Sequence, residues 1–263
     1  MNRDILRQVI VVMAVIATLV VNGLANALPF NGLTTGEISD RFQVYFVPAG
    51  YVFSIWGLIY VGLILYAIYQ ALPAQRENPR LRATGYLFAL SCLANIAWLF
   101  LWHYELFLFT LVAMGALLLL LIAIYLRLGI GRTAVSTGER WLVQLLFSVY
   151  LGWISVATIA NVTSVLDYLN WGGWGLSPEL WTAIMLLAGV GLAFGLAFSR
   201  GDVAYGLVII WAYAGIAVKH AGVPFVALAA WIAVGLVVLV LVTGLFFYRR
   251  RGQQSTAEPG TAT

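Results

Sequence analysis

The hydrophobic positions of the chain gather into long runs, and short polar segments separate one run from the next. A helix needs about 20 mostly apolar residues to cross a hydrocarbon core about 30 Å thick. Runs of roughly this length predict an all-α fold, a polytopic membrane bundle of about eight transmembrane helices. The predicted spans are residues 8–28, 48–71, 83–102, 106–126, 141–164, 179–199, 203–219 and 223–247.

The distribution of basic residues tests this count independently, because cytoplasmic segments accumulate Lys and Arg. With the N-terminus inside, only Arg41 and Lys219 of the fourteen basic residues fall in outer segments. A missed helix would scramble this alternation, so the charges predict an N-in, C-in topology. The net charge of +4 then follows from the topology, and it gives no indication of nucleic-acid binding.

The composition agrees with an integral membrane protein. The chain is 63% hydrophobic and only 9% charged, whereas about a quarter of the residues of a soluble domain are charged. We expect a multi-pass protein of the bacterial cytoplasmic membrane, with the lipid bilayer as its first partner.

The two ends of the chain and its cysteine raise separate questions. The basic start, the apolar run and Ala25-Asn26-Ala27 are also typical of a cleaved signal peptide, whose removal would leave seven helices. The polar tail that follows Arg251 is predicted to be disordered. Because Cys92 is the single cysteine, disulfides within the chain and cysteine metal sites are excluded.

Charged side chains are nearly absent from the predicted spans. None of the spans contains Asp or Glu in its interior, and Glu179 is the first residue of the span 179–199; proton-coupled pumps usually place such groups in the bundle. Lys219 and His220 are expected to extend to the outer interface. His103 and Glu105 lie in an outer turn, and a metal site built from His103 and His220 has no spacing to support it. We therefore predict no metal site, no catalytic residue and no enzyme activity.

Polar and aromatic residues inside three spans form the positive signal. They recur at spacings of three or four, which keeps them on one face of a helix. At about 1.5 Å of rise per residue, they lie in the middle and outer half of the membrane, at the level of Asn22. The three faces are Phe53, Trp56 and Tyr60; Ser91, Asn95, Trp98 and Trp102; and Tyr150, Trp153, Ala157 and Asn161.

Two interpretations of these faces compete. Interfacial packing, which is common for tryptophan, accounts for the residues at helix ends and in loops: Trp102, Trp141, Trp171, Trp174 and Trp181. It accounts poorly for Trp56, Trp98 and Trp153, which are deeper. An aromatic cavity with a few placed polar groups is typical of a ligand site, and we favour that interpretation.

The deep residues belong to motifs that resemble a known family. Residues 150–161, YLGWISVATIAN, resemble the fifth-helix motif of the TspO/translocator protein family, also called tryptophan-rich sensory proteins. The segment NIAW resembles the third-helix motif, and PAGYVFSIWGLIY resembles the entry into the second helix. The matching positions are Pro48, Phe53, Trp56, Tyr60, Asn95, Trp98, Tyr150, Leu151, Trp153, Ala157, Thr158 and Asn161.

The resemblance covers about residues 8–165 and has departures. Tyr51 and Ser54 stand where the family usually has a tryptophan and a second proline, and the spacing of Phe53 and Trp56 is one residue short. The family core has five helices, whereas this chain adds three, one of which carries the close-packing pattern Gly191-x-x-x-Gly195. We expect a five-helix domain at residues 1–165, a three-helix region at 166–248 and a basic tail at 249–263.

The resemblance implies a membrane binding, sensory or carrier protein for a hydrophobic planar ligand, such as a porphyrin or a sterol. All the matching positions except Leu151 are the expected ligand-binding residues, and the outer loop 29–47, with Asp40 and Arg41, is the expected lid. A porphyrin would be a ligand held by stacking and shape, and no cofactor is required. The alternatives are a permease for an amphipathic metabolite and an intramembrane enzyme. A homodimer is the expected assembly.

Overall fold

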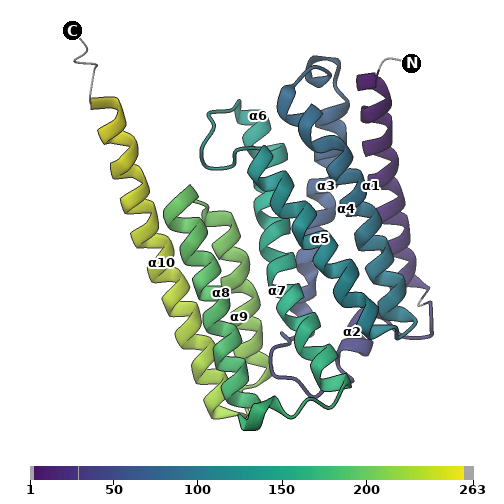
Figure 1. Cartoon of the computed structure of the whole chain (residues 1–263), viewed down its shortest axis with the longest axis vertical. Coiled ribbons are helices and arrows are strands. Elements are labelled where there is room, and N and C mark those ends of the chain that lie inside the picture. The colour runs from purple at the N-terminus through teal and green to yellow at the C-terminus, as the bar shows by residue number, and fades with distance from the viewer. Residues whose placement is uncertain (1–2, 29, 258–263) are drawn as a thin grey trace.

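The structure, a computed structural model, describes residues 3–28 and 30–257 and is a bundle of long helices that run side by side (Figure 1). Helix α1 (Arg3–Ala27) begins and α10 (Pro224–Ala257) ends at one end of the bundle, which we call the basic end. The opposite end holds α2 (Thr35–Ser39), and we call it the lid end (Figure 1). Residues 1–2, Pro29 of the predicted lid and residues 258–263 of the predicted tail lie outside the described residues.

The eight predicted spans are confirmed as helices. Within the described residues, seven helical segments are long and apolar enough to cross a membrane, and α9 is a shorter apolar helix. Together with α9, the seven long segments make eight apolar helices in the described part of the chain. An even number of crossings returns the chain to the end where it began, as the N-in, C-in prediction requires. The elements are α1 (Arg3–Ala27), α2 (Thr35–Ser39), η1 (Gly50–Ser54), α3 (Ile55–Ala71), η2 (Pro73–Gln75), α4 (Pro79–His103), α5 (Phe107–Arg127), α6 (Thr137–Glu139), η3 (Arg140–Gln144), α7 (Leu145–Tyr168), η4 (Gly173–Gly175), α8 (Pro178–Arg200), α9 (Val203–Lys219) and α10 (Pro224–Ala257).

The connection between α8 and α9 is only two residues long, and its sequence explains how it turns. Gly201 ends α8 in the left-handed conformation (φ 64°), which glycine adopts without steric cost. Asp202 then caps α9, because its side chain accepts a hydrogen bond from the backbone N–H of Tyr205. The two helices therefore run antiparallel side by side.

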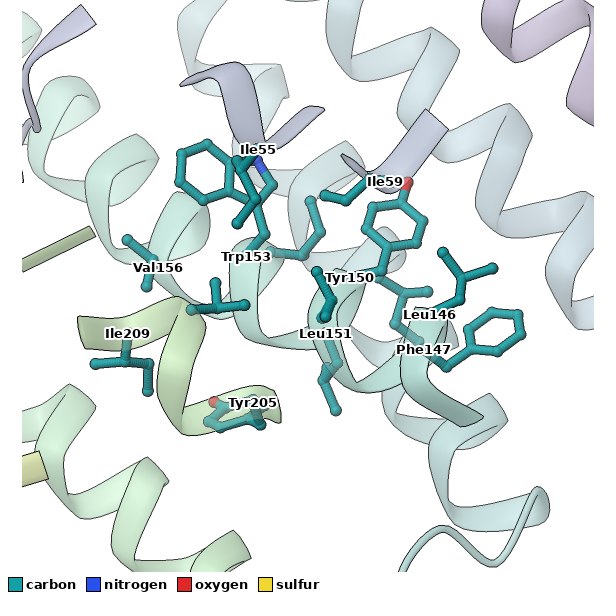
Figure 2. Packing of buried hydrophobic residues seen from close by; sticks show 14 of the residues in the cluster. Ile55, Ile59, Leu146, Phe147, Tyr150, Leu151, Trp153, Val156, Tyr205 and Ile209 are labelled. Atoms are coloured by element: carbon teal, nitrogen blue, oxygen red, sulfur yellow. The ribbon is translucent and has the colours of Figure 1, made fainter. Parts of the chain in front are cut away.

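Helix α7 is the centre of the bundle and the most buried of the spans. In Figure 2, its Tyr150 and Trp153 lie toward α3, whereas Leu151 and Val156 lie toward α9. A helix that is apolar on all sides is expected in a core position. One continuous cluster of buried residues includes members of α1 and of α10, so the core joins the two regions predicted at 1–165 and 166–248. That division stays a prediction.

Two local predictions differ from the structure. The structure describes α10 as helix as far as Ala257, six residues past Arg251, within the tail that was predicted to be disordered. Gly191 and Gly195 do not pack against another helix, because a Cβ at either would meet nothing within 4 Å. The close contact of α8 is instead at Gly189, where the hydroxyl of Tyr213 on α9 packs against the helix.

Candidate functional site

The lid, residues 30–47, crosses the lid end and contains the short helix α2. Thr34 caps α2: its hydroxyl accepts a hydrogen bond from the backbone N–H of Glu37, whose carboxylate accepts one from the backbone N–H of Thr34. This reciprocal capping box satisfies two donors that a helix start leaves free. A five-residue helix has little stability of its own, so contacts with the bundle must hold the lid.

Two ion pairs attach the lid to different parts of the bundle. Lys219 at the end of α9 lies 2.7 Å from Asp40 of the lid. Arg41 lies 2.5 Å from Glu105 in the turn between α4 and α5. Lys219 was expected to extend to the interface; the structure gives it a carboxylate partner instead. The lid therefore connects α9 to the α4–α5 turn.

The two histidines contact the lid at separate places. His103 Nε2 lies 3.1 Å from the hydroxyl of Thr35. The ring of His220 packs edge-on against Tyr45, with ring centroids 5.2 Å apart. Burial, and to a smaller extent the charge of Lys219, lowers the pKa of His220, which favours the neutral form of its ring. Among the described residues, no group of three or more His, Cys, Asp or Glu could hold a metal ion.

A small cavity of about 60 Å³ lies beneath the lid. Six of the eleven predicted ligand-binding residues line it: Pro48, Phe53, Trp98, Trp153, Ala157 and Asn161. The remaining lining residues are Thr35, Ser39, Val47, Trp102, Val156, Ala160 and Ser164. Since a water molecule takes about 30 Å³ in the liquid, the closed cavity has room for about two waters.

Most of the other predicted residues form an aromatic layer beside this cavity. The indole of Trp56 stacks on Tyr60 at 5.6 Å and meets Tyr150 edge-on at 6.0 Å. Trp153 meets Trp56 and Phe53 edge-on, with centroids 6.3 and 5.8 Å apart. Edge-on and offset pairs are the favourable arrangements of aromatic rings. This layer packs directly against the wall of the cavity.

The predicted asparagines and Thr158 are already hydrogen-bonded to neighbouring helices or within their own helix. Asn161 accepts a hydrogen bond from the Trp98 indole at 3.3 Å and donates one to the Thr110 hydroxyl at 2.9 Å. Asn22 of α1 donates to Asn95 at 2.8 Å. The Thr158 hydroxyl donates to the carbonyl of Ile154 within α7. Asn161 is thus the one predicted polar residue that both lines the cavity and links neighbouring helices.

Trp153 is different from these polar residues because its indole N–H has no acceptor. Its side chain is buried (3% exposed) and lines the cavity. Among the described atoms, Nε1 is buried without a hydrogen-bond partner. Leaving such a donor unsatisfied costs about 1 to 3 kcal/mol. Because Nε1 itself is not accessible from the cavity, a bound acceptor would reach this N–H group only as the surrounding side chains move.

A second, larger cavity lies on the other side of α7, and the sequence did not indicate it. It measures about 390 Å³ and is bounded by lid residues 43–46, the end of α7 and the start of α8. Trp171 and Trp181, which were assigned to interfacial packing, line it, and their rings lie 5.0 Å apart. The available signal was Trp171 and Trp174 in the loop between α7 and α8, together with Trp181 in the first turn of α8.

We expect the ion pair between Lys219 and Asp40 to hold the lid closed rather than to stabilise the whole fold. Replacing Lys219 by methionine should speed amide hydrogen exchange in residues 36–42 by up to about fivefold, because a solvent-accessible ion pair contributes at most about 1 kcal/mol. Exchange would be followed by mass spectrometry. Lys219→Arg keeps the charge and should exchange as the natural protein does; equal rates in all three proteins would contradict the assignment.

The chain matches the family of TSPO-like proteins over residues 8–243. The match extends beyond residue 165, where the motif resemblance ended, and includes α8, α9 and most of α10. No curated protein and no solved structure matches the chain.

Proposed function

We propose, from the premise that the chain belongs to the TSPO-like protein family, that it binds a hydrophobic planar ligand of the porphyrin or sterol class beneath the lid. The family and the helical fold show a membrane protein of the binding or transport type. The ligand class rests on the aromatic lining of the cavity, because flat apolar rings suit walls made of tryptophan and phenylalanine.

The observation that carries the proposal is the unsatisfied indole N–H of Trp153. A ligand with an acceptor at its edge, such as a carboxylate or a hydroxyl, would accept this hydrogen bond. The neighbouring Asn161 has its amide engaged on both sides, so it would contribute to the shape of the wall. The indole of Trp153 is therefore the proposed specific polar contact in a mostly apolar cavity.

The closed cavity is smaller than its proposed ligand. Pockets for drug-sized ligands occupy about 300 to 1,000 Å³, compared with about 60 Å³ here. Binding therefore requires the lid to move outward and the aromatic side chains to rearrange. The lid is held by ion pairs whose side chains are accessible to water, and such pairs contribute little free energy. The lid also buries Ile38 and Phe46 (both 1% exposed), so ligand binding must offset the exposure of these apolar side chains as the lid opens.

Replacing Trp153 by phenylalanine tests the proposal. The variant keeps an aromatic ring and removes the N–H group, so protoporphyrin should bind about tenfold more weakly, which corresponds to about 1.4 kcal/mol. Detergent-purified full-length protein would be titrated with protoporphyrin, and the porphyrin absorbance would report binding.

Trp171→Phe is the matched control, because it makes the same change in the second cavity. It should leave the affinity unchanged. If Trp171→Phe weakens binding and Trp153→Phe does not, the ligand lies in the larger cavity and the proposal is wrong. Absence of binding by the natural protein, for protoporphyrin and for a sterol alike, would also overturn it.

A permease for an amphipathic metabolite is the alternative. Sealed vesicles that contain the protein would be compared with vesicles that lack it. Uptake of the ligand only into the first would favour transport over binding. An intramembrane enzyme is a weaker alternative, because an acid–base pair or a nucleophile facing the cavity would be required. The homodimer and the bacterial cytoplasmic membrane stay predictions.

A further inference from the structure

Two cavities adjoin each other at the basic end, on the opposite side of the molecule from the lid. The first measures about 600 Å³ and lies between the turn after α5, the start of α7, the α8–α9 connection and α10. The second measures about 520 Å³ and lies between α3, α7 and α9. Trp141, Leu145 and Ala204 line both. The two cavities therefore meet along these three residues.

The first cavity is basic. Arg132, Arg140 and Arg200 line it, and within the described part of the chain no carboxylate lies within 4.0 Å of any of their guanidinium groups. Arg200 is 9% exposed, donates a hydrogen bond to the carbonyl of Ile130 and lies 5.8 Å from the ring centre of Tyr125. A buried guanidinium without an acidic partner is costly.

The single carboxylate in this cavity does not balance the three arginines. One oxygen of Asp202 accepts hydrogen bonds from the hydroxyls of Tyr125 and Ser148, at 2.8 and 2.7 Å. The other accepts from the backbone N–H of Tyr205. Three positive charges and one negative charge leave a net charge of about +2, which suits an anion.

The second cavity is apolar and follows the membrane-spanning part of the bundle. It runs along α3 from Leu65, near the basic end, to Ser54, which at 1.5 Å per residue is a length of roughly 17 Å. Its wall includes exposed side chains such as Leu58 (61%) and Leu207 (54%). It is therefore a groove that lies within the hydrocarbon layer and opens to it.

We propose that the joined cavities bind one anionic phospholipid. Its phosphate is held by Arg132, Arg140 and Arg200, and one acyl chain lies in the groove between α3, α7 and α9. Basic pockets between transmembrane helices on the cytoplasmic side are suited to anionic headgroups, and the positive-inside distribution assigns the basic end to that side. This proposal does not depend on the ligand beneath the lid.

The apolar groove distinguishes a lipid from a soluble phosphate. A small anion would use only the arginines and would leave the groove beyond Trp141 without a function. A lipid uses both cavities at once, and its headgroup and chain meet the protein at the depth where each would lie in the surrounding bilayer. Charge complementarity and the shared lining of the two cavities together support this occupant.

Lipid retention in native mass spectrometry tests the proposal. Full-length protein in detergent would be titrated with phosphatidylglycerol and with phosphatidylcholine of the same acyl chains. One phosphatidylglycerol should be retained at least about tenfold more tightly than phosphatidylcholine, and the double variant Arg132→Gln, Arg140→Gln should lose most of this preference. Arg132 and Arg140 are both exposed, so these substitutions should not prevent folding.

The control variant removes two other positive charges at the basic end, Arg76→Gln with Arg127→Gln. It should keep the preference for phosphatidylglycerol. An equal loss in both double variants would mean that only the general charge of this end matters, and it would overturn the proposal. Equal retention of the two lipids would overturn it as well. Displacement of phosphatidylglycerol by inorganic phosphate alone would assign the arginines to a soluble anion.

Discussion

Replacing Asp202 by alanine is expected to lower the free energy of unfolding by about 3 kcal/mol. The carboxylate is 8% exposed and accepts hydrogen bonds from Tyr125, Ser148 and the backbone of Tyr205. Hydrogen bonds to a charged group contribute about 1.5 to 3 kcal/mol each, and loss of a helix cap costs about 1 kcal/mol. These contributions would add to at least about 4 kcal/mol, and water in the adjoining cavity would satisfy part of what the substitution exposes, which lowers the expected total to about 3 kcal/mol.

The graded variant is Asp202→Asn, which keeps an acceptor oxygen for the cap and should cost about half as much. Unfolding of the detergent-purified protein in increasing dodecyl sulfate would measure both. Tyr125→Phe should destabilise the natural protein and have almost no effect when Asp202 is already alanine, because the partner is gone. Independent, additive effects of the two substitutions would show that this hydrogen bond does not stabilise the fold.

The position of Asp202 illustrates what the sequence could not predict. Hydropathy places it between two spans, so it does not count as a carboxylate in the interior of a predicted span. The short connection nevertheless leaves Asp202 buried between α5, α7 and α9. Burial of a turn residue depends on which helices lie beside it, and the pattern along one helix carries no such information.

The helices themselves were predictable because each needs only its own apolar run and polar ends. The helical faces were predictable in part: the spacing of Trp98 and Trp153 places both in the wall of one cavity. Thr158 shares the motif, yet its hydroxyl bonds within α7. Trp102 was assigned to the interface from its place at a helix end, but it lines the cavity. Depth and periodicity cannot decide such cases, since the lid covers this end of the bundle.

Replacing Gly152 by leucine is expected to lower the free energy of unfolding by about 3 kcal/mol, because it would separate α7 from α9. Gly152 is the unassigned position within the Y-L-x-W motif. A Cβ there would lie 3.1 Å from the carbonyl oxygen of Tyr205 and 3.1 Å from the Cβ of Val208. A leucine adds three further carbons at a contact that is already tight, and overpacking of this kind typically costs about 1 to 3 kcal/mol.

Gly191→Leu is the matched control, because a Cβ at Gly191 would meet nothing within 4 Å. It should change the stability by less than about 0.5 kcal/mol, and Gly152→Ala should fall between the two leucine variants. Unfolding in dodecyl sulfate would rank the three. Equal stability of the Gly152→Leu and Gly191→Leu variants would mean that α9 moves away from α7 without cost, and the close contact between the central helix and the three C-terminal helices would then not stabilise the fold.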